Sequence, residues 1–140
     1  MIPQELISRI KKGSNFGGGM ATMRQISFGM LDMSWHGIDP TNIEDVKGHE
    51  EKAFENTKLF PEVEENCMST SFSHILQGGY SVGYYSYKWA DMLDADRFEY
   101  FQHKGIFSKE SAQNFREDVS SRGGTEHPMI LYKRFRGKEP

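Results

Sequence analysis

The sequence predicts an all-α fold on three observations. Apolar residues recur at spacings of three and four along most of the chain, which is the period of one helix face. The strict alternation of apolar and polar residues that a half-buried strand shows is hard to find. Proline, serine and glycine stand at the ends of the periodic stretches, where helices begin and end. Because 140 residues is the length of one ordinary domain, we expect a single helical domain over residues 1–140.

Two helices are predicted at the start of the chain. Pro3 suits the first turn of a helix, because its fixed φ is already helical, and Gly13 ends that helix. A second, longer helix ends around Gly37. The apolar face of the first helix is Leu6, Ile7 and Ile10, and that of the second is Met20, Met23, Ile26, Met30 and Met33.

A third helix is predicted after the turn at Asp39 and Pro40. Thr41 and Glu44 have the spacing of a capping box, in which each side chain accepts a hydrogen bond from a free backbone N–H at the helix start. We expect this helix to run to about Lys58 and, because it is rich in charge, to lie mostly in solvent.

The helical periodicity disappears between residues 60 and 83. Pro61, a Ser-Thr-Ser stretch and the pair Gly78-Gly79 indicate a long irregular segment instead. Irregular segments of this length are usually either functional or disordered. We favour a functional segment.

Three more helices are predicted in the rest of the chain. The first runs from Tyr84 to Phe101. Ser108 caps the second, which ends at the pair Gly123-Gly124, and Pro128 starts the third. The apolar residues of these last two helices are Ala112, Phe115 and Val119, followed by Met129, Tyr132 and Phe135.

Charge and composition exclude two classes of partner. The 17 Lys and Arg residues are interspersed with 20 Asp and Glu residues, so there is no basic surface for nucleic acid. The longest apolar runs are far shorter than the roughly 20 residues of a membrane span, and the N-terminus lacks a signal-peptide pattern. One cysteine, Cys67, cannot form an internal disulfide. We expect a cytoplasmic protein, with the periplasm as the alternative.

No metal-binding motif is present in the sequence. A helical zinc site of the common kind needs two histidines four residues apart with a glutamate between them. The nearest approach begins at His49, but Ala53 stands where the second ligand would be. Cys67 and His74 are too weak a pair for a nucleophilic dyad or half of a metal site. We therefore expect no metal ligand in this chain.

One histidine and four tyrosines gather between residues 74 and 87. Three glycines, Gly78, Gly79 and Gly83, stand among them and let the backbone approach a ligand closely. Phenols stay protonated at neutral pH and can donate hydrogen bonds to a developing oxyanion. On a helix that begins near Gly83, Tyr84 and Tyr87 share one face. The residues alone leave two readings open, a polar recognition site and ordinary core aromatics with satisfied hydroxyls.

Together with the residues that come after it, this stretch resembles the C-terminal region of the thimet oligopeptidase and peptidyl-dipeptidase family of zinc metallopeptidases, and is most similar to the bacterial peptidyl-dipeptidases. The matching pieces are Phe-Ser-His-Ile at 72–75, Gly-Gly-Tyr at 78–80, Gly-Tyr-Tyr-Ser-Tyr-Lys-Trp-Ala at 83–90, Gly-Ile-Phe at 105–107, Phe-Arg at 115–116, Ser-Arg-Gly-Gly-Thr at 121–125 and Lys-Arg-Phe-Arg-Gly-Lys-Glu-Pro at 133–140. The upstream part is less distinctive, but it is similar to the helices that come after the zinc site in that family.

The resemblance implies that the chain is the C-terminal helical portion of a larger, two-lobed helical metallopeptidase. In such a protein an upstream His-Glu-x-x-His helix and a later glutamate bind zinc, and these residues are expected before Met1. The zinc polarises water and the scissile carbonyl. By motif match, Tyr84 and Tyr87 are the catalytic residues that stabilise the oxyanion. The substrate-binding residues implied in the same way are His74, Gly78, Gly79, Tyr80 and Gly83.

The function expected for the parent protein is hydrolysis of short peptides with release of C-terminal dipeptides. A broader endo-oligopeptidase activity is the alternative within the family. Because the zinc ligands are expected in the missing N-terminal part, the chain alone should be inactive. A different class of function, a non-catalytic helical module that binds peptides or holds a partner chain through residues 74–87, also remains open, as does a merely structural role for them.

Overall fold

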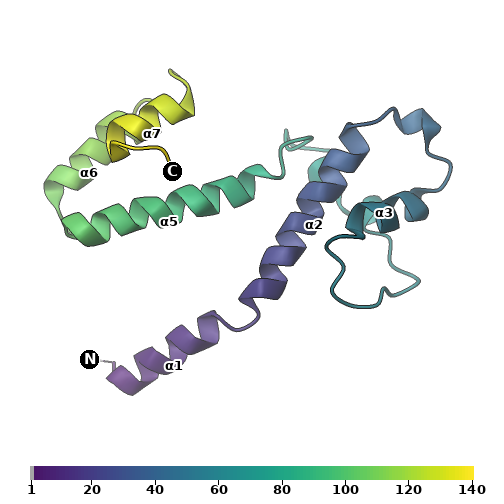
Figure 1. Ribbon diagram of the computed structural model, residues 1–140, viewed down its shortest axis with the longest axis horizontal. Helices are drawn as coiled ribbons and strands as arrows, with labels where there is room; N and C mark the ends of the chain where they lie inside the picture. Colours follow the sequence, from purple (N-terminus) through teal and green to yellow (C-terminus); the bar gives the residue numbers. More distant parts are fainter. Residues whose placement is uncertain (1) are drawn as a thin grey trace. The chain divides into compact units, whose positions relative to one another are not determined.

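The computed structural model describes residues 2–140, and it is helical with no strand in that range. The predicted all-α fold is therefore confirmed. The chain divides into two compact units, Met1–Lys88 and Trp89–Pro140 (Figure 1). The expectation that residues 1–140 form a single domain stays a prediction.

The first two helices of unit 1 agree with the sequence. Helix α1 (Gln4–Ser14) begins directly after Pro3, and none of its residues is buried. Helix α2 (Gly18–His36) follows Gly17, which has a positive φ of 73° that suits a residue without a side chain. The N–H of Gly37 donates to the carbonyl of Met33 and ends α2. Both helices are thus confirmed, as is the end of α2 at Gly37, whereas α1 runs one residue beyond the predicted stop at Gly13.

The predicted capping box at Thr41 is wrong. Thr41 lies in a single 3-10 turn, η1 (Pro40–Asn42), where Asp39 accepts hydrogen bonds from both the backbone N–H and the hydroxyl of Thr41. That hydroxyl therefore serves the turn and does not cap a helix. Helix α3 (Val46–Phe54) begins later, and its cap is Asp45, whose carboxylate accepts from the N–H of Lys47 at 3.1 Å. It also ends before Lys58.

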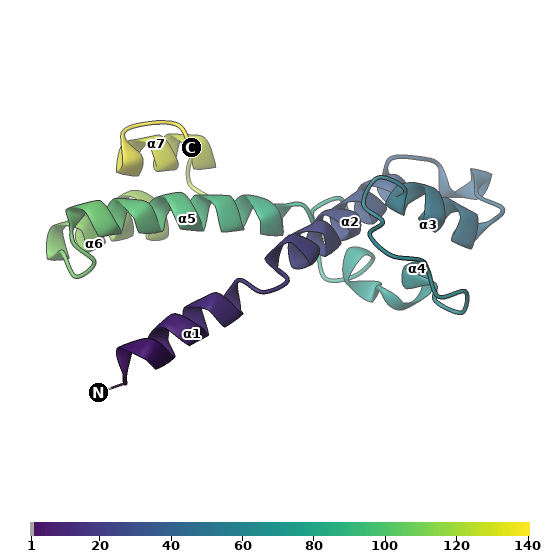
Figure 2. The ribbon, with the colours of Figure 1, turned by 60° about the horizontal axis from the view of Figure 1, so that its bottom comes forward.

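Residues 60–83 are mostly irregular, as predicted, and contain only two short helical turns. These turns are α4 (Met68–Ser71) and η2 (Ser73–Ile75). Helix α4 packs against α3, and α3 packs against α2 (Figure 2). The irregular segment thus folds back onto the helices that precede it in the chain.

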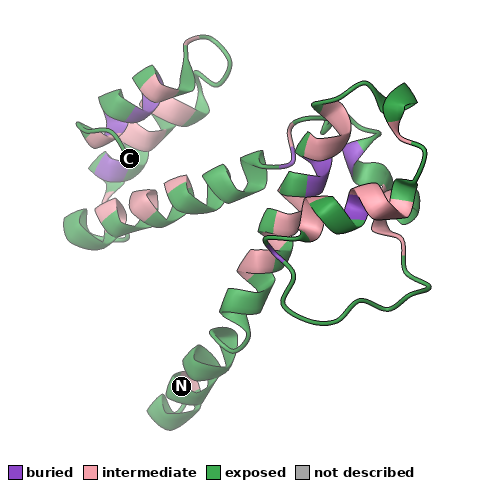
Figure 3. Ribbon diagram, turned by 45° about the vertical axis from the view of Figure 1, so that its right-hand side comes forward, coloured by how far each residue is buried: buried purple, intermediate pink, exposed green. Residues whose placement is uncertain are grey.

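The core of unit 1 forms where α2, α3 and the irregular segment meet (Figure 3). Its buried apolar residues are Leu31, Ile75 and Tyr84, and the half-buried residues around them are Phe28, Trp35, Ala53, Phe54, Met68 and Phe72. Of the three buried residues, Ile75 comes from the irregular segment and Tyr84 from the turn that directly follows it. The irregular segment therefore completes the core of this unit.

Unit 2 contains most of α5 (Ser86–Lys104) and all of α6 (Lys109–Phe115), a π-helical turn η3 (Arg116–Ser120) and α7 (Pro128–Arg136). The predicted cap at Ser108 is confirmed, because its hydroxyl accepts from the N–H of Ser111 at 3.2 Å. The predicted start at Pro128 is also confirmed. Helix α5 begins two residues later than predicted, since Tyr84 and Tyr85 lie in the turn before it.

Helix α7 supplies the buried apolar residues of unit 2. The rings of Phe101, Phe115 and Phe135 lie 5.2–6.2 Å apart, and Leu131 is buried beside them. The carboxylate of Asp96 on α5 accepts hydrogen bonds from Arg136 and Tyr132 on α7. In the part of the chain that the structure describes, no helix combines the length and the apolar character needed to cross a membrane.

The cap of α3 can be tested with one pair of variants. Asp45→Ala removes the acceptor for the N–H of Lys47, and loss of such a cap typically costs about 1 kcal/mol. We expect that decrease in the free energy of unfolding in urea. Glu44→Ala, the matched control at the residue of the rejected capping box, should change it by less than about 0.5 kcal/mol. A larger decrease in the free energy of unfolding for Glu44→Ala than for Asp45→Ala would contradict this assignment and support the capping box.

Candidate functional site

A buried carboxylate on α2 holds the turn that carries the tyrosines. Asp32 is fully buried, and its Oδ1 and Oδ2 atoms accept hydrogen bonds from the backbone N–H groups of Val82 and Tyr84, both at 2.9 Å. The Nδ1 atom of His36, one helical turn further along, lies 2.9 Å from Oδ1. These contacts satisfy the carboxylate, which would otherwise be costly to remove from water. They join α2 to a segment 50 residues away.

A second buried carboxylate holds the other end of the same segment. Glu50 on α3 accepts from the backbone N–H of Met68 at 2.8 Å and from the hydroxyl of Ser69 at 2.6 Å. Trp35 in turn donates to the Ser69 hydroxyl at 3.0 Å. Burial raises the pKa of Glu50. Its hydrogen bonds with Ser69, Met68 and Cys67 together outweigh this effect, so the pKa lies below the ordinary value of 4.5. Glu50 is therefore ionised at neutral pH.

Between these two anchors the structure brings His74, Tyr80, Tyr84 and Tyr87 together. The His74 ring lies 4.5 Å from the Tyr80 ring, 5.7 Å from Tyr84 and 6.0 Å from Tyr87. Tyr80 and Tyr87 stack with their ring centres 5.4 Å apart, and Tyr84 lies 5.0 Å from Tyr87. The Nε2 atom of His74 is 3.1 Å from the Tyr87 hydroxyl. These four residues form the aromatic cluster.

The three tyrosines of the aromatic cluster differ in exposure. Tyr84 is 9% exposed; its ring packs against Phe28 and Phe72, and its hydroxyl donates to Gln25 at 3.3 Å. Tyr80 and Tyr87 are 36% and 39% exposed. Of the three phenols, those of Tyr80 and Tyr87 are therefore the more accessible to a ligand.

Tyr87 is suited to donate a hydrogen bond. Its hydrogen bond with Tyr80 and its partial desolvation raise its pKa above the ordinary value of 10.0. The phenol consequently keeps its proton throughout the physiological pH range. A protonated phenol beside an imidazole is a donor for a polar or negatively charged oxygen atom.

The glycines of the segment have two different roles. Gly78 and Gly79 have positive φ angles of 76° and 82°, which side-chain-bearing residues rarely adopt, and both are exposed. Gly83 has no such angle, but a Cβ atom there would lie 3.3 Å from the carbonyl oxygen of Tyr80. The sequence-based assignment of these three glycines to substrate binding stays a prediction.

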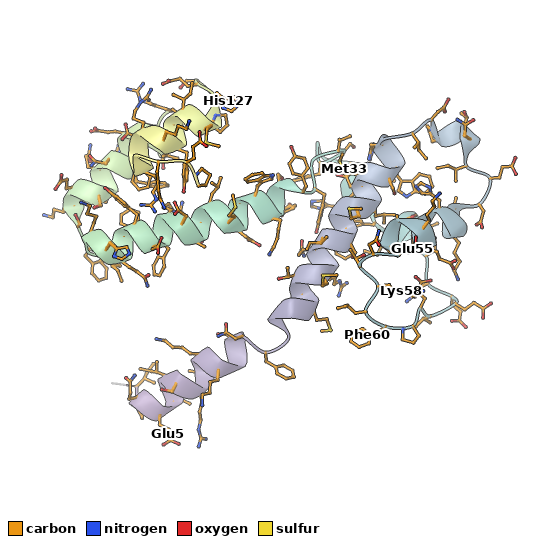
Figure 4. All side chains as sticks on the ribbon, in the orientation of Figure 1. Glu5, Met33, Glu55, Lys58, Phe60 and His127 are labelled. Carbon is orange, nitrogen blue, oxygen red and sulfur yellow. The ribbon has the colours of Figure 1, made fainter. Side chains whose placement is uncertain are left out.

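An apolar cavity of about 190 Å³ opens beside the aromatic cluster. Met33, labelled on α2 in Figure 4, is part of its lining. The complete lining is Gln25, Ile26, Gly29, Met30, Met33, Tyr84, Tyr85, Tyr87 and Lys88. Two tyrosines of the cluster, Tyr84 and Tyr87, thus line a mainly apolar cavity.

Residues 2–140 contain no group of three or more His, Cys, Asp or Glu side chains that could hold a metal ion. His49, which lies nearest to a zinc motif in sequence, packs its ring 4.4 Å from Trp35 and places Nε2 3.1 Å from the hydroxyl of Ser34. Its contacts are structural, and its side chain is half-buried.

Sequence reasoning missed Asp32, Glu50 and Gln25. One signal was present for Asp32, the only acidic residue of α2, because it stands among Met30, Leu31 and Met33 on an apolar stretch. Glu50 is one of several glutamates in a charged helix, so nothing in the sequence distinguished it.

The fold and site define a helical protein with a partly exposed histidine–tyrosine cluster on a segment that two buried carboxylates hold. The chain matches peptidase family M3 over residues 1–140. It is 38% identical to oligopeptidase A of Escherichia coli over 140 residues and 36% identical to dipeptidyl carboxypeptidase of the same organism over 142. It is also 34% identical to an organellar oligopeptidase A of Arabidopsis thaliana over 144 residues.

This chain belongs to peptidase family M3, a family of zinc metallopeptidases. Each of these alignments includes 99% of the chain but only 18–21% of the relative. The chain therefore spans about a fifth of the length of the curated relatives it matches. The family membership predicted from the motifs of residues 72–140 is confirmed.

The contribution of Glu50 to stability should depend on pH. Its pKa is depressed in the folded state, so its stabilisation is present above the unfolded pKa and is lost as the pH falls through the folded one. Near neutral pH we expect Glu50→Gln to lower the free energy of unfolding by about 2 kcal/mol, because hydrogen bonds to a charged group are lost.

This difference should shrink as the pH is lowered below 4.5, because protonated Glu50 then resembles the variant. Urea unfolding of both proteins across that range measures it. Glu51→Gln, an exposed neighbour on the same helix, is the control. A gap between wild type and Glu50→Gln that stays constant in acid would contradict this assignment.

Proposed function

We propose that this chain provides the tyrosine side of the active site of a zinc-dependent peptidase that acts on short peptides. The aromatic cluster carries the proposal, because it places two exposed phenols and an imidazole next to an apolar cavity. The membership in family M3 supports it. So do the names of the relatives, which are oligopeptidases and dipeptidyl carboxypeptidases.

The described residues do not fit a zinc site, since no suitable group of ligands occurs among them. Zinc would be bound by the part of the parent protein that this chain does not include. The contribution of the chain is therefore the binding of the peptide and the stabilisation of charge on it.

Tyr87 is the proposed oxyanion donor. Its pKa is raised, its hydroxyl is accessible, and hydrogen bonds aimed at a developing oxyanion act mainly in the transition state. A His74 tautomer with a proton on Nε2 would donate to the Tyr87 oxygen, and a substrate oxygen would then replace Tyr80 as the acceptor for the phenol hydrogen. His74 and the stacked ring of Tyr80 then hold Tyr87 in its orientation.

Tyr84 is proposed as the second oxyanion donor. Unlike Tyr87, it also packs in the core of unit 1. Its hydroxyl has a partner in Gln25, but at 3.3 Å this hydrogen bond is long. The ring is packed between Phe28 and Phe72, so the hydroxyl is held at a defined position. A substrate oxygen that displaced Gln25 would meet a donor that needs no further ordering.

Release of C-terminal dipeptides is the proposed reaction, with internal cleavage as the alternative. The identities to oligopeptidase A and to dipeptidyl carboxypeptidase, 38% and 36%, do not separate the two. Mass spectrometry of the products from a decapeptide with a free C-terminus would distinguish them. Dipeptides in sequence from the C-terminus support the proposal, and internal fragments support the alternative.

Replacement of Tyr87 by phenylalanine in the full-length parent tests the donor role with the same peptide. Loss of one oxyanion donor typically lowers kcat about 100- to 1,000-fold. We expect that loss with little change in KM, because the hydrogen bond forms mainly in the transition state. Tyr100→Phe, at a tyrosine of α5 outside both the cluster and its cavity, is the matched control and should leave kcat unchanged within about twofold. Similar kinetics for both variants would disprove the role of Tyr87.

The isolated chain should not hydrolyse peptides. Because its described residues offer no zinc site, we expect no release of product from short peptides with added zinc. A coupled assay with and without a chelator measures this, and the full-length parent is the positive control. Turnover by the isolated chain that a chelator abolishes would contradict the prediction.

The non-catalytic alternative makes a different prediction for the parent. A helical module would bind peptides at the aromatic cluster while the complete protein left them intact. Binding that depends on Tyr80 and Tyr87 without any hydrolysis by the parent would favour that alternative.

A further inference from the structure

We propose that Asp32 is a positioning residue for the active site, one that fixes the tyrosines of the aromatic cluster through the backbone of residues 82–84. It touches neither His74 nor any phenol, and it is fully buried, so it does not bind substrate itself. The catalytic meaning of this role rests on the proposed function. The structural part, that the cluster depends on Asp32, can be tested without any activity.

Only one partner of Asp32, His36, is local to α2. A fully buried carboxylate is costly unless hydrogen bonds satisfy it, and apolar residues of similar volume are often at least as stable. Asp32 lies inside α2 and caps no helix end. Apart from His36, its hydrogen-bonding partners are the N–H groups of Val82 and Tyr84. Its main structural effect is therefore to hold that distant turn.

The turn that Asp32 holds is strained. Val82 has a φ of 60°, in the left-handed region that β-branched residues avoid. Such a conformation persists only where the surroundings enforce it. The N–H of Val82 itself donates to Asp32, and the next N–H, that of Gly83, donates to the carbonyl of Tyr80 at 2.8 Å. Without the carboxylate, the turn loses the contact that enforces its geometry.

The three tyrosines are all connected to this turn. Tyr80 accepts the hydrogen bond that closes it, and Tyr84 donates its own N–H to Asp32. The carbonyl of Tyr84 then accepts from the N–H of Tyr87 at 3.2 Å, at the start of α5. A shift at residues 82–84 would consequently move the phenols relative to His74. Misplacement of catalytic groups by about 1 Å can cost roughly 100-fold in rate.

Glu50 provides a matched control, because it is also a buried carboxylate that accepts backbone N–H groups of the irregular segment. Its partners are Met68 and Ser69, which precede the turn at 82–84 in sequence and are not hydrogen-bonded to Asp32. Asp32→Asn and Glu50→Gln each replace a carboxylate by an amide of nearly the same size. Both should destabilise unit 1, but only Asp32→Asn should disturb the aromatic cluster.

The direct measurement is NMR of the 140-residue chain. Ring-to-ring cross-peaks between His74 and Tyr80, and between Tyr80 and Tyr87, report the cluster in wild type, where these rings lie 4.5 and 5.4 Å apart. We expect Asp32→Asn to lose these cross-peaks and to keep its helical circular dichroism. Glu50→Gln should keep them. Cross-peaks that survive in Asp32→Asn, or loss of the entire helical fold in it, would overturn the proposal.

Rescue of the turn gives a second test. Asparagine tolerates a positive φ far better than valine does, so Val82→Asn added to Asp32→Asn should restore part of the cross-peaks. If Asp32 only stabilised unit 1 and did not enforce the turn at residues 82–84, the added substitution should restore no cross-peaks. Failure of this rescue would mean that the strained turn is not what Asp32 enforces, and would also overturn the proposal.

Kinetics of the full-length parent separate this proposal from the proposed function. Asp32→Asn should lower kcat roughly 10- to 100-fold at nearly constant KM, and Glu50→Gln should change kcat by less than about threefold. Lost cross-peaks together with unchanged kcat would leave the positioning intact and refute a catalytic role for the cluster. Intact cross-peaks would refute the positioning itself, whatever the activity.

Discussion

The contact on which the rest of unit 1 depends is the buried carboxylate of Asp32 against two backbone N–H groups of residues 82–84. An irregular segment has no ladder of its own to satisfy its backbone, so each buried N–H needs a specific acceptor. Asp32 and Glu50 supply such acceptors at the two ends of the segment. Residues 60–84 therefore have a defined conformation without regular secondary structure, and Ile75 and Tyr84 enter the core as a result.

The same arrangement explains why the aromatic cluster belongs both to the core and to a site. The sequence left two readings open, core aromatics and polar recognition, and the structure assigns them to different residues. Tyr84 is buried among phenylalanine rings, whereas Tyr80 and Tyr87 keep more than a third of their surface exposed. A rigid, buried neighbour limits the motion of the exposed phenols, which is the usual requirement for a preorganised hydrogen-bond donor.

The errors in the sequence-based prediction have one physical cause. Helix ends marked by a strong local signal, such as Pro3, Ser108 and Pro128, were predicted correctly because the signal and the backbone group it serves are neighbours. The cap of α3 was misplaced because the Thr41 hydroxyl donates to Asp39 within the turn η1, and Asp45 instead accepts from the N–H of Lys47 at the helix start. Spacing alone cannot show which turn each side chain stabilises.

Local periodicity, caps and motifs in the sequence by themselves determined the all-α class, the helix starts after Pro3 and Ser108 and at Pro128, the membership of the aromatic cluster and the family. Only the tertiary structure decided that Asp32 and Glu50 hold the irregular segment, that Tyr84 is buried, and that an apolar cavity lies beside the cluster. The reason is the distance along the chain between the interacting residues. A helix pattern depends on residues three and four apart, whereas the acceptor for the N–H of Tyr84 lies 52 residues away and becomes a partner only through folding.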